Sequence, residues 1–98
     1  MEFMNVVRMR IQPGKFEEWQ KIIHENMQMG PPPEGLLELR HIKYGENEVC
    51  VIGLWASGEA LAAARPRLKQ GLDRFRHLLE GETDPISGPV ILDSTKMR

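Results

Sequence analysis

Two side chains near the middle of this 98-residue sequence are of types that could bind a flat organic molecule and take a proton from it. Trp55 offers a broad aromatic face for stacking and an indole N–H that donates a hydrogen bond. His41 lies in an alternating apolar stretch, where partial burial would lower its pKa and let the neutral ring accept a proton from an enol or phenol. We therefore predict His41 and Trp55 as catalytic residues. The structural alternatives are a histidine hydrogen-bonded at the edge of the core and a tryptophan that seals a helix–sheet junction.

Residues that would line a pocket beside this pair come from the first strand, the first helix and the third strand. Asn5 shares a strand face with apolar residues, so it would either hydrogen-bond a ligand oxygen or cap the strand end. His24 lies at the edge of the apolar helical stripe, and methionines supply an adaptable lining or simply fill gaps in the core. The predicted ligand-binding residues are Asn5, Val7, Met9, Trp19, Ile23, His24, Met27 and Val51.

Other kinds of site have little support in the sequence. His24, His41 and His77 lack the spacing of metal ligands, and no carboxylate cluster accompanies them. The single cysteine, Cys50, has no partner within the chain and no neighbouring base, so we interpret it as a small buried hydrophobe. The glycines form neither a phosphate-binding loop nor a dinucleotide fingerprint. We expect no metal and no cofactor.

Composition and charge restrict the partners. The 13 basic and 14 acidic residues nearly cancel, which disfavours a nucleic-acid partner because that surface must be strongly basic. The longest apolar run, 49–56, is too short to cross a membrane, and no secretory leader opens the sequence. We therefore expect a cytoplasmic protein that does not bind membranes.

The elements that must position these residues follow from hydrophobic periodicity. Alternation predicts strands, while apolar residues at three- and four-residue steps, such as Phe16, Trp19, Ile23 and Met27, predict helices. Pro66 should divide the second helical region in two. The predicted strands are 3–11, 36–44, 48–55 and 88–93, and the predicted helices are 15–27, 58–64 and 66–80. The order βαββαβ predicts one ferredoxin-like α+β domain over 1–98, with a four-stranded antiparallel sheet and both helices on one face.

The face of the sheet without helices should carry too much apolar surface for a lone subunit. A three-residue hairpin loop at 45–47 would place Leu39 opposite Gly53, His41 opposite Val51 and Leu37 opposite Trp55. A slip of one residue would exchange the two faces. The uncovered side chains would pack on a second copy through a twofold interface, with the charged residues pairing across it. They are Val6, Ile42, Cys50, Ile52 and Leu54, mixed with Arg8, Arg10, Glu38 and Arg40.

Two motifs resemble a known family. A strand that ends in Pro13-Gly14-Lys15, and a later strand that runs into Trp55-Ala56-Ser57-Gly58-Glu59-Ala60-Leu61, are similar to the antibiotic biosynthesis monooxygenase-like group of the dimeric α/β-barrel superfamily. The resemblance covers about residues 4–92. It implies a homodimer whose two sheets enclose a barrel, with a cavity between helices and sheet in each subunit. It also implies activities that include cofactor-independent oxygenation and haem degradation.

The sequence departs from the haem-degrading branch of that family. Aligned on Gly14-Lys15, the asparagine of that branch falls on Val7, and the helical segment 58–64 has no histidine. Alanines at 62–64 also stand where the common pattern of the family has a histidine. We therefore do not expect haem degradation. Two hypotheses remain: a cofactor-independent, monooxygenase-like oxidoreductase acting on a small hydrophobic aromatic or enolic substrate, and a non-catalytic small-molecule-binding or regulatory homodimer. RNA-recognition domains share the strand order, but the stretch 48–55 lacks the basic residues they need.

Overall fold

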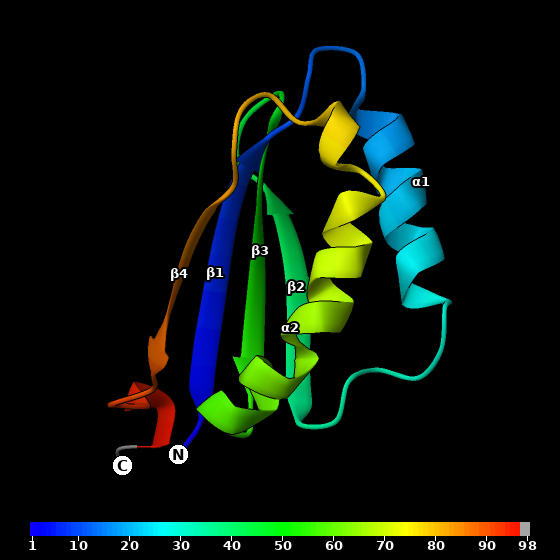
Figure 1. Cartoon of the computed structure of the whole chain (residues 1–98). Coiled ribbons are helices and arrows are strands. Elements are labelled where there is room, and N and C mark those ends of the chain that lie inside the picture. The colour runs from blue at the N-terminus through cyan, green and yellow to red at the C-terminus, as the bar shows by residue number, and fades with distance from the viewer. Residues whose placement is uncertain (97–98) are drawn as a thin grey trace.

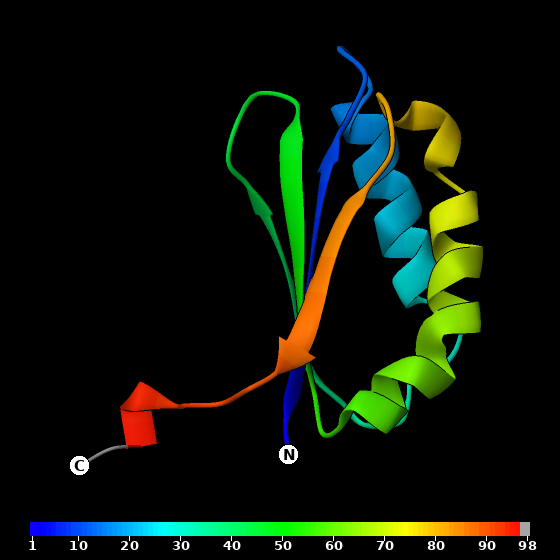
Figure 2. The same ribbon diagram turned by 60° about the vertical axis from the view of Figure 1, so that its left-hand side comes forward.

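The strands and helices follow the predicted β-α-β-β-α-β order in the computed structural model, which describes residues 1–96 (Figure 1). The strands pair in the order β2-β3-β1-β4, and every neighbouring pair is antiparallel. Both helices lie on the same side of the sheet (Figure 2), so the predicted ferredoxin-like α+β fold is confirmed. The elements are β1 (Phe3–Arg10), α1 (Phe16–Met27), β2 (Leu36–Lys43), β3 (Glu48–Trp55), α2 (Gly58–Asp73) and β4 (Asp84–Pro89), with 3-10 turns at Arg76–Leu78 and Ser94–Lys96.

The predicted hairpin register between β2 and β3 is correct over most of its length. His41 pairs with Val51 and Leu39 pairs with Gly53, which fixes the helix-facing side of both strands. The prediction that Leu37 lies opposite Trp55 is wrong, because an irregularity between Leu36 and Glu38 pairs Trp55 with Leu36 instead. The extra residue of a bulge is left unpaired, and Leu37 is 51% exposed.

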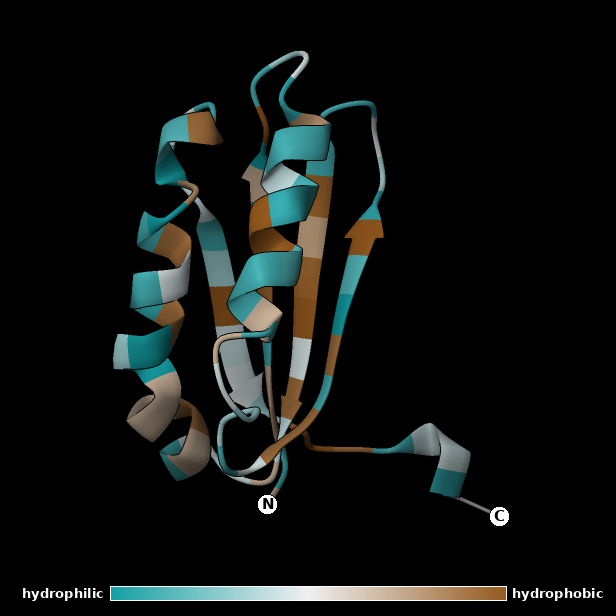
Figure 3. Cartoon of the chain, turned by 90° about the vertical axis from the view of Figure 1, so that its right-hand side faces the viewer, coloured by the Kyte–Doolittle hydropathy of each residue, from teal (hydrophilic) through white to brown (hydrophobic). Residues whose placement is uncertain are grey.

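The core lies between the sheet and the helices, and it consists of two clusters. One cluster holds buried residues from β1, α1, β3 and the segment after α2: Met9, Ile11, Trp19, Val49, Phe75, Leu78 and Leu79. The other holds Trp55, Leu61 and Ala64 at the opposite end of the sheet. Full burial of each large apolar side chain contributes about 1.5–3 kcal/mol. Figure 3 shows apolar residues recurring along both helices and along the strands of the sheet.

The predicted break at Pro66 is wrong. One helix, α2, runs from Gly58 through Pro66 to Asp73. Proline removes one helical hydrogen bond and pushes on the preceding turn, which bends a helix rather than ending it when tertiary packing holds both sides. Leu61 on one side and Leu68 on the other both pack in the second core cluster, and the ribbon of α2 changes direction along its length (Figure 1).

The predicted helix end at residue 80 is also wrong. The chain leaves α2 at Asp73, forms a short 3-10 turn, and pairs with the end of the first strand. Ile11 bridges to Leu79, and the Glu80 N–H donates to the Arg10 carbonyl at 2.8 Å. These backbone bonds are available only when the two segments meet in space, and they replace the last turn of the helix.

The last strand lies earlier than predicted, at 84–89 rather than 88–93. Its residues include Pro85, Gly88 and Pro89, which argue against a central strand. However, β4 is an edge strand that pairs only with β1, where proline is tolerated. The register places Phe3 opposite Pro89, so residues 91–93 continue past the start of β1 and extend away from the sheet (Figure 2).

Candidate functional site

A cavity of about 1370 Å³ opens between the sheet and the two helices, at the level where the two core clusters separate. A typical small-molecule pocket measures about 300–1,000 Å³. Phe75 lines one end, Trp55 and Leu61 line the other, and Val7, Leu39 and Val51 form part of the sheet wall. The loop from Gly30 to Pro33 contributes to the rim. The cavity is therefore large enough for a ligand of several rings.

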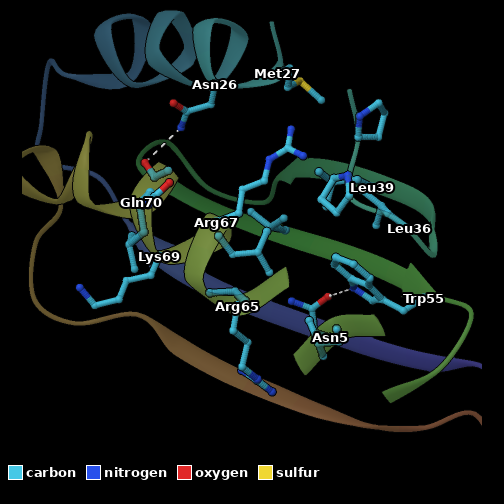
Figure 4. A pocket seen from close by; sticks show the side chains of 18 of the residues that line it. Asn5, Asn26, Met27, Leu36, Leu39, Trp55, Arg65, Arg67, Lys69 and Gln70 are labelled. Carbon is cyan, nitrogen blue, oxygen red and sulfur yellow. Dashed lines mark hydrogen bonds between the residues drawn. The ribbon is translucent and has the colours of Figure 1, made fainter. Parts of the chain in front are cut away.

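Asn5 and Trp55 form a hydrogen-bonded pair in the cavity wall (Figure 4). The Trp55 indole Nε1–H donates to Asn5 Oδ1 at 2.8 Å, and Trp55 is only 1% exposed. Gly53, which pairs with Asn5 in the sheet, leaves room for this bond. A Cβ at position 53 would lie 2.9 Å from Trp55 Nε1 and closer still to Asn5 Oδ1. The indole N–H that the sequence suggested for a ligand is therefore already donated to Asn5.

The pairing fixes the orientation of the Asn5 amide. Because Oδ1 must face the indole donor, the Nδ2 amino group points to the other side of the amide. Among residues 1–96, no hydrogen bond joins Asn5 Nδ2 to another side chain or carbonyl. Asn5 also lines the cavity, so this wall offers a ligand an N–H donor rather than an acceptor.

His41 lies apart from Trp55. It faces the helices from β2, and its ring centroid is 6.2 Å from that of Trp19 in an edge-on arrangement. Burial, and secondarily the charge of His24, lower the pKa of His41, which agrees with the neutral ring expected from the sequence. His41 is nevertheless absent from the cavity lining, although its strand partner Val51 is part of it. The structure does not bring the two predicted catalytic residues into one cavity.

The predicted ligand-binding residues divide into two groups. Two of them, Trp19 and His24, do not line the cavity. Trp19 is a core residue, 3% exposed, and its indole N–H has no partner within residues 1–96. His24 is exposed on α1. The predicted residues that do line it are Asn5, Val7, Met9, Ile23, Met27 and Val51.

The sequence reasoning missed the contribution of α2. Arg65, Arg67 and Leu68 line the cavity, as do Pro85 and Ser87 on β4. The helix was predicted to break at residue 66, and the last strand was predicted at 88–93 rather than 84–89, so neither element was expected to line the cavity. One signal was present, since Leu61, Leu68 and Leu72 recur at helical spacing across the proline.

The described residues hold no group of three His, Cys, Asp or Glu side chains arranged to bind a metal ion. Across residues 1–96, neither helix combines the length and the apolar character needed to cross a bilayer.

Comparisons with known proteins support the fold. No protein-family model matches the sequence, and no curated protein matches it. SnoaB, a cofactor-independent oxygenase from Streptomyces nogalater whose N63A mutant was solved, is similar over 94% of this chain and 95% of its own, with 14% identity and a TM-score of 0.76. A provisionally named antibiotic biosynthesis monooxygenase from Caulobacter crescentus CB15 has 19% identity and a TM-score of 0.79, and covers 93% of this chain and 91% of its own.

A conserved protein from Methanosarcina mazei Go1 shares 14% identity with a TM-score of 0.80, over 91% of this chain and 92% of its own. Identities this low establish a shared fold. The chain has the fold of the antibiotic biosynthesis monooxygenase-like proteins, as the two sequence motifs predicted.

Proposed function

We propose that this chain is a cofactor-independent, monooxygenase-like enzyme that acts on a small hydrophobic aromatic or enolic substrate. The observation that carries the proposal is the Asn5–Trp55 pair, which presents one oriented amide donor in a largely apolar cavity. The fold shared with SnoaB, described as a cofactor-independent oxygenase, supports the same reading.

In the proposed reaction the substrate supplies the electrons. An enolate or phenolate oxygen accepts a hydrogen bond from Asn5 Nδ2, and this bond favours the ionised form of the substrate. The proton lost on ionisation passes to solvent water, since the described lining holds no histidine, and the carbanion form then reduces O₂. For an anthrone, the methylene carbon loses two hydrogens and gains one oxygen atom, and the second oxygen atom leaves as water. Four electrons pass from the substrate to O₂, so no external reductant is required.

Oxygen uptake tests this proposal. The protein would be mixed with a panel of anthrones and quinols, and O₂ consumption would be followed together with quinone absorbance. We expect one O₂ consumed per anthrone without release of hydrogen peroxide, and a loss of about tenfold or more in Asn5→Ala, in line with the removal of one oxyanion donor. His41→Ala should stay near wild type, as should the control Lys21→Gln on the exposed face of α1. No consumption above buffer across the panel would refute the enzymatic proposal.

A second candidate is a non-catalytic small-molecule-binding homodimer. One observation favours it: within the described lining there is no histidine, and the single acidic residue, Glu38, has its side chain on the open sheet face, where it pairs with Arg40 at 3.1 Å. The cavity thus lacks an evident proton acceptor. Tight binding of an aromatic ligand without oxygen uptake would support this candidate over the enzyme.

The proposal includes a homodimer formed through the open sheet face, in a reducing cytoplasmic setting. Three ion pairs on that face lie within the subunit: Arg8–Asp84, Arg10–Glu48 and Arg40–Glu38. The charges that were expected to pair across the interface are therefore already paired within the sheet.

The apolar residues between these ion pairs have no helix over them. Ile42 is 47% exposed and Ile86 is 62% exposed. The segment after β4 adds exposed apolar residues, with Ile91 at 88% and Leu92 at 60%. Burying several such side chains against a second copy would contribute several kcal/mol, at ~25 cal/mol per Å². Light scattering should therefore give twice the chain mass of 11.2 kDa.

A further inference from the structure

The charges around the cavity do not balance. Five charged residues line it, and three of them have ion-pair partners within residues 1–96. The remaining two, Arg65 and Arg67, have neither an ion pair nor a side-chain hydrogen bond to any described residue. The three partnered residues are Lys69 with Asp73 at 3.1 Å, Arg74 with Glu25 at 3.2 Å and Glu38 with Arg40 at 3.1 Å. The cavity therefore carries two unmatched positive charges and no unmatched negative charge.

The two arginines flank Pro66 and reach different parts of the cavity. Arg65 lies on the same helical stripe as Leu61, Leu68 and Leu72, which face the interior. Arg67 is two residues further on, about 200° around the helix. In Figure 4 the two side chains extend in different directions from α2, with Arg67 on the side of Leu39. Both residues are exposed, so their guanidinium groups stand in water at the mouth of the cavity.

This distribution selects a class of ligand. The interior is apolar and ends at Trp55, which suits a ring system. A guanidinium group matches the planar geometry of a carboxylate or sulfonate and binds it more strongly than a neutral acceptor.

We infer that the ligand of this cavity is an amphipathic aromatic anion, whose ring system occupies the interior beside Trp55 and whose acidic group pairs with one guanidinium group at the mouth, that of Arg65 or that of Arg67. This inference rests on the proposed function, because it names the substrate class of the same cavity. It predicts that a neutral aromatic compound binds more weakly than its acidic counterpart.

Two fluorescent dyes of matched size test this inference. 8-Anilinonaphthalene-1-sulfonate carries a negative charge, and N-phenyl-1-naphthylamine has the same ring system without it. We expect the sulfonate to bind wild-type protein at least threefold more tightly. In the double variant Arg65→Gln/Arg67→Gln the preference should disappear through weaker sulfonate binding, while the affinity for the neutral dye stays unchanged. Lys21→Gln, which removes one exposed positive charge from α1, should keep the preference.

Each outcome separates the inference from the proposed function. Loss of the sulfonate preference in wild-type protein at high salt would support the inference, because salt screens charges at an exposed mouth. Equal binding of both dyes to wild-type protein, or a preference that survives in the double variant, would overturn the anionic class and leave the hydrophobic cavity in place. Failure of both dyes to bind would overturn the cavity as a ligand site, and with it the proposed function.

Discussion

Replacing each tryptophan by phenylalanine should show how much the Asn5–Trp55 hydrogen bond contributes to stability. Trp19 and Trp55 are buried to nearly the same degree, 3% and 1% exposed, so the two replacements remove similar apolar volume. They differ in the indole N–H. Trp55 donates to Asn5 Oδ1 at 2.8 Å, whereas Trp19 Nε1 is buried with no partner in the described part of the chain.

The magnitudes follow from this difference. Loss of part of a buried ring costs about 1–2 kcal/mol at either site, below the cost of a full truncation to alanine. Trp55→Phe also leaves Asn5 Oδ1 without its donor, which adds about 1 kcal/mol because Asn5 is only partly buried. Trp19→Phe removes an unpaired polar group, so no such cost applies. We expect Trp55→Phe to lower the free energy of unfolding by at least 1 kcal/mol more than Trp19→Phe.

The assay is urea unfolding followed by far-ultraviolet circular dichroism, which does not depend on tryptophan fluorescence, at one fixed protein concentration. Asn5→Leu completes a double-mutant cycle with Trp55→Phe, and we expect a coupling energy of about 1 kcal/mol between the two positions. A Trp19→Phe variant that loses as much stability as Trp55→Phe, or a coupling energy near zero, would refute the reasoning.

Three further predictions concern the space beside this pair, the core histidine and the open sheet face. Gly53→Ala should destabilise the protein by about 1–3 kcal/mol in the same urea assay, because its Cβ would collide with the hydrogen-bonded pair; Gly88→Ala, which meets nothing within 4 Å, should cost far less. Burial lowers the pKa of His41 in the folded state, so the contribution of the neutral ring to the free energy of unfolding should be complete above about pH 6.5. It should be lost as the pH falls through the folded pKa. Between pH 7 and 5 the melting temperature should fall less in His41→Gln than in wild type. In the exposed control His77→Gln it should fall as much as in wild type, and equal falls in all three proteins would contradict the assignment. Ile52→Glu should convert a dimer into a monomer in light scattering, and a wild-type protein that is already monomeric at micromolar concentration would exclude the proposed interface.

Much of the sheet could be predicted because its signals are local. Alternating apolar residues set the first three strands within a residue or so, and the short loop at 45–47 set the register of His41 opposite Val51. In a strand with one buried face the apolar residues recur every two positions, so the strand can be recognised without knowing which strands lie beside it. The helix that contains Trp19 could be predicted in the same way, because its apolar residues recur at three- and four-residue steps.

The errors occurred where tertiary contacts override local preference. Pro66 suggests a helix break, yet packing on both of its sides keeps α2 continuous. Pro85 suggests a loop, yet the edge position of β4 tolerates it. The bulge beside Leu37 has no sequence signal that we recognised.

The residue types that can do chemistry were evident from the sequence itself, because the donors and acceptors of an indole, an imidazole and an amide follow from the residue type alone. Which of these groups form a hydrogen bond with each other was decided only by the fold. Asn5 and Trp55 are 50 positions apart, and they meet because β1 and β3 pair with Gly53 between them. The pairing of β2 with β3 places His41 opposite Val51 and away from Trp55, and the unbroken α2 brings Arg65 and Arg67 to the cavity. Such proximity depends on backbone hydrogen bonds between distant segments, which no local pattern encodes.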